Sequence, residues 1–235
     1  MITPALLVSA VGCSQPYAEL YAPHLAEACQ HHAINTPARL AAFLAQIGHE
    51  SGSLRYVREI ATGDAYEGRA DLGNIHPGDG QRYRGRGLIQ ITGRANYARM
   101  TRLLAQFGAP NFETEPEALE QTKWACWSAA AFWAAAGCNT LADKGNFEPI
   151  TRAINGGLNG LEDRKQRWER AKQALATCTP TAPEKAPSGP PVEPQAPSAA
   201  PKGTTMPPFL HAALPSLIEM IPKLGRLFAG GSEVA

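Results

Sequence analysis

Two glutamates, Glu50 and Glu59, stand nine residues apart in a pattern that suits acid–base chemistry. Glu50 ends a strongly apolar stretch, and a carboxyl group held against apolar surroundings resists ionisation, as a general acid requires. A turn of serine and glycine and a short returning segment could bring Glu59 to the opposite wall of one cleft. Hydrolysis of a glycosidic bond needs two such carboxyl groups, one to protonate the leaving oxygen and one to activate water or attack the sugar. The alternative for Glu59 is a surface ion pair with Arg55 or Arg58.

The segment Tyr83–Gly93 alternates glycine, arginine and β-branched residues. Glycine lets the backbone approach a ligand closely. If the segment is extended, Gln90 and Thr92 point to the same side. A threonine hydroxyl can hold a water molecule there, and a glutamine amide can bind a sugar hydroxyl or acetamido group. Asn96 and Tyr97 follow, and they offer a second amide and an aromatic platform.

Helix caps and apolar periodicity predict a mainly α domain. Thr36 and Pro37 supply an N-cap and a first-turn proline, and apolar residues then recur at helical spacing up to Glu50. We expect further helices near the N-terminus, from about Pro116 to Gly137, around Phe147–Ile154, and from about Asp163 onward. Asn155 places another amide at the end of one of these helices, before two glycines.

The region between Gly52 and Arg94 is rich in glycine and shows little helical periodicity. We therefore expect a long loop, with short strands at Leu54–Ile60 and Leu88–Thr92, and long ordered loops are usually functional. Six arginines and no acidic residue lie between positions 82 and 102 (82, 84, 86, 94, 99 and 102). This stretch is either a solvated basic face or a rim that attracts an anionic polymer.

The composition is that of a soluble globular protein. The 235 residues carry a net charge of +1, which gives no argument for a nucleic-acid partner. The five cysteines are odd in number and widely spaced, which speaks against a zinc site or a disulfide framework and favours a reducing cytoplasm during synthesis. Cys126 falls in an apolar helical pattern and is expected in the core. The N-terminal segment has no positive start, so we expect a first helix there and no signal peptide.

The composition changes sharply at Cys178. Eight of the twenty prolines fall between Pro180 and Pro201. We expect a folded catalytic domain over residues 1–178, an extended Pro/Ala-rich linker over 179–205, and a small element over 206–235. Apolar residues of this last segment recur at helical spacing, interrupted by two prolines, as in an amphipathic helix that lies on a membrane or a partner. The alternative is a helix that docks on its own domain.

Four motifs of this chain together resemble glycoside hydrolase family 19, which contains chitinases and phage-type endolysins. They are His49-Glu50-Ser51-Gly52, Arg58-Glu59-Ile60, Tyr83-Arg84-Gly85-Arg86-Gly87-Leu88-Ile89-Gln90-Ile91-Thr92 and Ile154-Asn155-Gly156-Gly157, in the order of the family. The likeness covers about residues 36–175 and is greatest to the phage-type endolysins. It implies a mainly helical, lysozyme-like bilobal domain with a substrate cleft, and an inverting mechanism without metal or cofactor.

The resemblance also implies roles for single residues. It makes Glu50 the general acid and Glu59 the general base, with Thr92 helping to hold the attacking water. Gln90, Asn96 and Asn155 match substrate-binding positions, and Arg164 matches an arginine near the cleft. Long-loop chitinases carry the second acid further along the chain, which leaves Glu67 as an alternative to Glu59.

Three functions are compatible with this pattern. The first is an endolysin that cleaves the β-1,4 bonds of peptidoglycan; the short loop without cysteine pairs and the basic stretch favour it. Such an enzyme would be made in the host cytoplasm and act at the wall after release, with a membrane surface or a holin-type partner at its C-terminal segment. The second is a chitinase acting on chitin oligomers. The third is an inactive glycan-binding protein, although such a protein would not need Glu50, Glu59 and Thr92 together.

Overall fold

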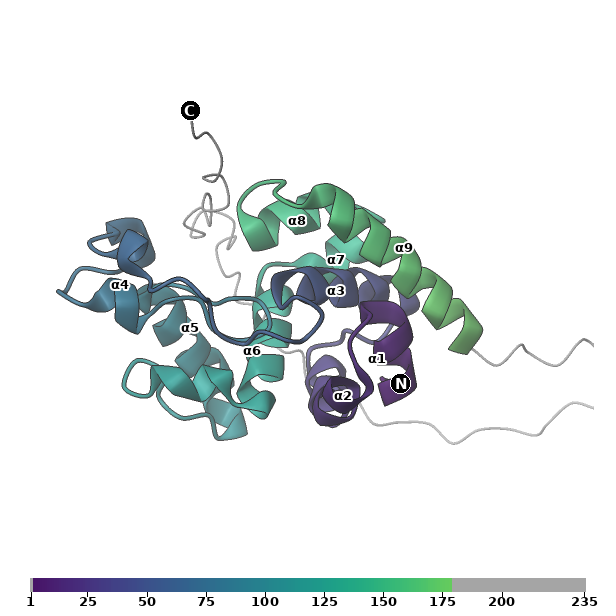
Figure 1. The fold of residues 1–235 in the computed structure, drawn as a ribbon, viewed down its shortest axis with the longest axis horizontal. Coiled ribbons are helices and arrows are strands. Elements are labelled where there is room, and N and C mark those ends of the chain that lie inside the picture. Colours follow the sequence, from purple (N-terminus) through teal and green to yellow (C-terminus); the bar gives the residue numbers. More distant parts are fainter. Residues whose placement is uncertain (1, 179–235) are drawn as a thin grey trace, which may run out of the picture. The chain divides into compact units, whose positions relative to one another are not determined.

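The computed structural model describes residues 2–178 (Figure 1). The α-helices are α1 (Pro4–Val11), α2 (Gln15–His31), α3 (Pro37–Glu50), α4 (Asp79–Arg82), α5 (Arg94–Leu104), α6 (Thr122–Ala135), α7 (Cys138–Asp143), α8 (Phe147–Asn155) and α9 (Leu161–Cys178). Short 3₁₀ helices cover Asp64–Tyr66, Ala70–Leu72, Ala105–Phe107 and Pro116–Glu120. The expectation of a mainly helical domain is confirmed, and no helix within residues 2–178 is long and apolar enough to cross a membrane.

Two largely buried helices, α3 and α6, organise the core. Every residue of α3 from Leu40 to Gly48 is buried, and in α6 the same holds from Trp124 to Trp133. Helix α9 packs along α3 and α1, while α6 packs on α2 and α5. In Figure 1, α4 and α5 therefore lie to one side of α6, and α1, α8 and α9 lie to the other. Cys126 is fully buried among these residues, as predicted.

Local sequence signals placed most helices correctly. The Thr36 hydroxyl accepts a hydrogen bond from the backbone N–H of Arg39, which confirms the predicted cap of α3. The expected start of a helix near Pro116 is corrected by the structure. A 3₁₀ turn occupies Pro116–Glu120, and α6 begins only at Thr122. The helix ends at Ala135, and Gly137 follows with a φ of 69°, as expected of a glycine that ends a helix; α7 begins directly after it.

The two predicted strands are wrong. Within residues 2–178 the only β pairing consists of the single bridges Arg58–Arg86 and Arg86–Ile91. Ser53 and Leu54 have φ values of 62° and 64°, and Gln90 has a φ of 55°, so the backbone turns where extended segments were expected. The bridges nevertheless bring the loop after α3 against the glycine-rich segment.

Asp79 anchors the long loop to the start of α5. Its buried carboxylate accepts hydrogen bonds from the guanidinium of Arg94 at 3.0 and 2.5 Å, and from the backbone N–H groups of Ile75 and His76. The bonds from Arg94 are the main cause that lowers the pKa of Asp79, while burial acts in the opposite direction. Asp79 thus joins the loop at Ile75 and His76 to Arg94, the first residue of α5.

We expect Asp79→Asn to destabilise the protein by about 3 kcal/mol at pH 7, because it leaves the Arg94 charge without its buried partner. Because the pKa of Asp79 is lowered by folding, its carboxylate stabilises the protein above the unfolded-state pKa of about 4, and this contribution is lost as the pH falls through the folded-state pKa. The difference in the free energy of unfolding between wild type and variant should therefore shrink below about pH 4. Urea unfolding at several pH values measures this difference.

Asp71→Asn is the matched control. Its carboxylate pairs with Arg69 at the surface, and 45% of its side chain is exposed. We expect little change in stability, because exposed pairs contribute little. Equal effects of the two substitutions would contradict the anchoring role of Asp79.

The predicted linker and terminal element, 179–205 and 206–235, lie outside the described residues. Their assignment as a linker and an amphipathic segment therefore stays a prediction.

Candidate active site

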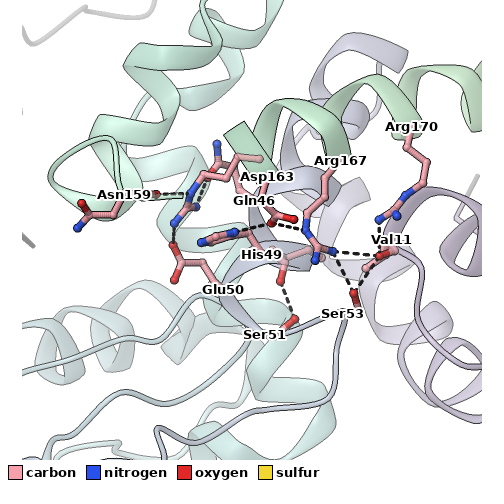
Figure 2. Close-up of polar contacts among 12 residues, drawn as sticks. Val11, Gln46, His49, Glu50, Ser51, Ser53, Asn159, Asp163, Arg167 and Arg170 are labelled. Atoms are coloured by element: carbon pink, nitrogen blue, oxygen red, sulfur yellow. Dashed lines mark hydrogen bonds and ion pairs between the residues drawn. The ribbon is translucent and has the colours of Figure 1, made fainter. Parts of the chain in front are cut away.

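Glu50 lies at the C-terminal end of α3 and faces α9 (Figure 2). Its Oε1 accepts a hydrogen bond of 2.5 Å from Arg164, and 15% of its side chain is exposed. We expected apolar surroundings for this carboxyl group. That prediction is wrong, since the hydrogen-bond partner of Glu50 is a guanidinium. Oε2 has no hydrogen-bond partner among residues 2–178, so one oxygen is left to face a substrate.

Arg164 is fully buried, and each arm of its guanidinium is used. Besides Glu50, it donates to the Gln46 side chain at 2.5 Å and to the backbone carbonyl of Asn159 at 3.1 Å. Gln46 is itself buried and donates to the hydroxyl of Thr151 on α8. The acid on α3 is thus held by a polar network that reaches α8 and α9, which fixes its direction.

A second cluster lies one residue away, at His49. The Nδ1 atom of His49 lies 2.6 Å from Asp163, which also accepts a 2.6 Å hydrogen bond from Arg167. Burial alone would raise the pKa of Asp163, but the bonds from His49 and Arg167 outweigh it and lower the pKa. Arg167 continues to Ser53 and to the carbonyl of Val11, so the end of α3 is tied to α1 (Figure 2).

Glu59 is held on both oxygens. Oε1 accepts a 2.8 Å hydrogen bond from the Tyr66 hydroxyl, and Oε2 accepts a 3.0 Å bond from the backbone N–H of Gly85. Burial raises the pKa of Tyr66, and the bond to Glu59 raises it further, so this hydroxyl remains a donor. The alternative surface ion pair with Arg55 or Arg58 does not form.

Gly85 brings Glu59 and Gln90 together. A Cβ atom placed on Gly85 would lie 2.8 Å from the Gln90 side-chain oxygen and 3.2 Å from Oε2 of Glu59. Both side chains therefore lie against a residue that has no side chain of its own. The backbone supports this approach, because Glu59 donates to the carbonyl of Gly85 and Gly87 donates to that of Val57.

Thr92 and Asn96 belong to the same turn. Thr92 is 5% exposed, and its hydroxyl donates to the carbonyl of Gln90 at 2.9 Å. Asn96 donates to the carbonyl of Thr92, which holds the turn on α5. Gln90 and Thr92 do not project from one extended segment as expected, because the chain turns at Gln90.

Tyr97 is not a sugar platform. It is fully buried, stacks edge-on against Tyr83, and donates its hydroxyl to the carbonyl of Arg84 at 2.6 Å. This predicted binding role is corrected, because a residue three positions after the start of a helix at residue 94 can turn inward as easily as outward. Tyr56, which is 43% exposed and lies beside Gly52, is the exposed aromatic side chain of this region.

Asn155 has a side-chain oxygen without a hydrogen-bond partner, whereas both carboxylate oxygens of Glu67 are hydrogen-bonded. The side-chain oxygen of Asn155 is buried and has no hydrogen-bond partner, which a bound ligand could supply. Both oxygens of Glu67 accept backbone N–H groups, from Gly78 at 2.7 Å and Gly80 at 2.8 Å. Glu67 therefore ties the loop to the start of α4, and, as in Glu59, each of its carboxylate oxygens accepts one hydrogen bond.

Sequence reasoning overlooked Gln46 and Tyr66. Gln46 lies one turn before Glu50 on the same face of α3, so helical spacing alone could have drawn attention to it. Tyr66 had no such signal, because its contact with Glu59 depends on the path of an irregular loop. Among residues 2–178, no three His, Cys, Asp or Glu side chains gather as a metal site would require.

Known proteins resemble the chain in sequence. A protein of Haemophilus influenzae, described as a glycosyl hydrolase family 19 domain-containing protein, is 34% identical over 160 residues, which cover 53% of this chain and 74% of that protein. An endochitinase of Arabidopsis thaliana is 36% identical over 118 residues, which cover 50% of this chain and 39% of the endochitinase. No protein-family model matches the chain.

Two solved structures share the fold. Chitinase C from Streptomyces griseus superposes with a TM-score of 0.59 at 22% identity, covering 74% of this chain and 76% of its own. A bacterial family 19 chitinase superposes with a TM-score of 0.60 at 22% identity and covers 74% of this chain and 94% of its own. The helical arrangement of residues 2–178 is therefore the lysozyme-like arrangement of these chitinases.

Proposed function

The chain belongs to glycosyl hydrolase family 19 and is a glycoside hydrolase, and from this premise we propose that it cleaves the β-1,4 bonds of bacterial peptidoglycan, in the manner of phage endolysins. Chitin, which shares the N-acetylated β-1,4-linked sugars, is the competing substrate. The polymers differ in charge, because chitin is neutral whereas peptidoglycan carries the carboxylates of its peptides.

Uncompensated positive charge in the basic stretch is the observation that carries the proposal. Arg86 and Arg94 pair with carboxylates, but Arg82, Arg84, Arg99 and Arg102 have no carboxylate partner within residues 2–178. Of these four, Arg82 and Arg84 line a hollow next to Gly85, the residue that holds Glu59, so their charges lie beside the candidate site, where they would attract an anionic polymer.

In the proposed reaction, Glu50 gives its proton to the leaving glycosidic oxygen. Its free Oε2 is the atom placed to do so, while Oε1 stays on Arg164. The guanidinium stabilises the carboxylate that is left once the proton has been transferred. Arg164 is thus a positioning residue, fixed in turn by Gln46.

Glu59 takes the part of the base. It would remove a proton from a water molecule that attacks the opposite face of the sugar ring, which inverts the anomeric configuration. Tyr66 and the N–H of Gly85 hold its carboxylate in place. Thr92 would help to hold that water, and Gln90 and Asn155 would bind the acetamido or hydroxyl groups of the sugar.

The decisive experiment compares two substrates for the wild-type protein. We expect reducing ends to be released from purified Gram-negative peptidoglycan, and NMR should show the α-anomer first, because a β bond is cut with inversion. Chitin oligomers serve as the second substrate. Cleavage of chitin with an intact wall would make the protein a chitinase, and a β-anomer formed first would exclude the inverting mechanism.

For the cell, we propose synthesis in the host cytoplasm and action at the wall after release. The buried thiols Cys13, Cys29, Cys126 and Cys138 are all unpaired, which suits a reducing compartment. The segment 206–235 is proposed to contact a membrane surface or a holin-type partner, on its amphipathic sequence alone. A protein lacking it should digest purified wall normally but lyse intact cells less; equal lysis would argue against that contact.

A further inference from the structure

A hollow of about 430 Å³ opens beside the residue that holds Glu59. Its lining includes Thr62, Gln81, Arg82, Arg84, Arg86 and Glu117. Three arginines and a single glutamate thus line one opening. The neighbour of Arg84 in sequence, Gly85, is the residue whose N–H holds the candidate base.

Two of the three arginines are occupied by the protein. Arg86 is 2% exposed and bonds to Glu120 at 2.7 Å and to Glu117 at 3.3 Å, so its charge is neutralised. Arg82 donates to the backbone carbonyls of Glu113 and Thr114, at 2.9 and 3.0 Å, and keeps its charge. It can therefore attract an anion, although its own donors are partly used.

Arg84 is the cation left without a partner. No hydrogen bond or ion pair joins its guanidinium to residues 2–178, and its Nε is buried without an acceptor. A buried donor without an acceptor costs about 1–3 kcal/mol. The terminal nitrogens of Arg84 also have no acceptor within residues 2–178 and are not buried, and the planar guanidinium fork matches a carboxylate in two parallel bonds.

The backbone and Cβ of Arg84 are fixed, so its side chain starts from one defined point. The buried Tyr97 hydroxyl donates to the Arg84 carbonyl at 2.6 Å. Gly63, with a φ of 92°, packs against it, and a Cβ there would come 2.9 Å from the Arg84 Cβ. Such prior ordering reduces the entropy lost when a ligand binds.

We propose that Arg84, assisted by Arg82, binds a carboxylate of the peptide stem of peptidoglycan. This inference rests on the proposed function. A glycan strand whose scissile bond lies at Glu59 would carry its substituents past the adjacent hollow. Chitin has no carboxylate to place there, so the contact would favour peptide-bearing wall strands over chitin.

Arg84→Gln tests the contact on three substrates: soluble uncrosslinked peptidoglycan strands, the same strands stripped of their stems by an amidase and with the lactyl carboxylates thereby exposed converted to methylamides, and chitin oligomers. On intact strands we expect KM to rise about tenfold with little change in kcat, because the variant loses a charge-assisted hydrogen bond to the stem carboxylate. On stripped strands and on any chitin that is cut, the variant should match wild type. Arg84→Lys, which keeps the charge but loses the fork, should fall between them.

Arg102→Gln is the matched control, since it removes the same charge from an exposed position of α5 outside the hollow. It should leave all rates unchanged, and thermal melting checks that each variant folds. An equal loss for Arg84→Gln on intact and stripped strands, or no loss on either, would overturn the stem contact alone. Wild type that cuts chitin but no wall strand would overturn the proposed function, and the stem contact with it.

Discussion

Glu50→Gln should lower kcat by about 10²- to 10⁴-fold, the contribution of a positioned general acid. Glutamine has the shape of glutamate and can accept the bond from Arg164 through its carbonyl oxygen, but it has no proton to give. Substrate binding should therefore persist while turnover stops. Reducing-end release on whichever glycan wild type cuts, together with binding to the same glycan, measures both.

Gln46→Glu is the informative companion variant. It places a second carboxylate on Arg164 in the buried network, so that the guanidinium is shared. We expect a smaller loss of kcat than in Glu50→Gln, with a clear loss of stability. If Glu50→Gln kept more than a tenth of the wild-type rate, Glu50 would not be the acid.

Glu59→Gln should also abolish turnover, with a loss of about 10²- to 10⁴-fold in kcat. The amide can still accept the bond from Gly85 and can donate to the Tyr66 oxygen, so the geometry is kept while the base is lost. Azide is a nucleophile that needs no general base. It should restore turnover with an α-glycosyl azide as product, and it should not do so in Glu50→Gln.

Glu67→Gln is the control for this comparison. Its carboxylate accepts the N–H groups of Gly78 and Gly80, and an amide can keep only one of these bonds. We expect near-normal kcat and slightly lower stability. If Glu67→Gln lost activity and Glu59→Gln did not, Glu67 would be the base, and the geometry around Gly85 would need another explanation.

Local chemistry determined what could be predicted. Thr36 and Pro37 mark the start of α3 by a cap and a fixed φ, and both effects act within one turn. The strand predicted at Leu54 failed for a different reason. Ser53 and Leu54 adopt left-handed backbone angles, held by the bond from the Leu54 N–H to the Ser51 hydroxyl. A leucine in that region has a local energetic cost that its sequence pattern does not reveal.

The candidate site was harder to predict because its contacts are distant in sequence. Glu50 and Arg164 are 114 residues apart, and periodicity in either helix says nothing of their meeting. Only the resemblance to a known family placed both residues at one cleft. Tyr97 shows the opposite failure: its residue type suggested stacking on a sugar, but burial against Tyr83 and Arg86 decided its role.

The contacts that α9 makes with α3 and α1 also determine when the domain can assemble. Arg164, Arg167 and Arg170 reach back across 114, 156 and 159 residues to Glu50 and to the carbonyl of Val11. During translation these contacts cannot form until α9 has left the ribosome, since domains emerge from the N-terminus onward. Glu50 would stay without the guanidinium of Arg164 for much of synthesis. A nascent chain should therefore be inactive until α9 has packed against α3 and α1.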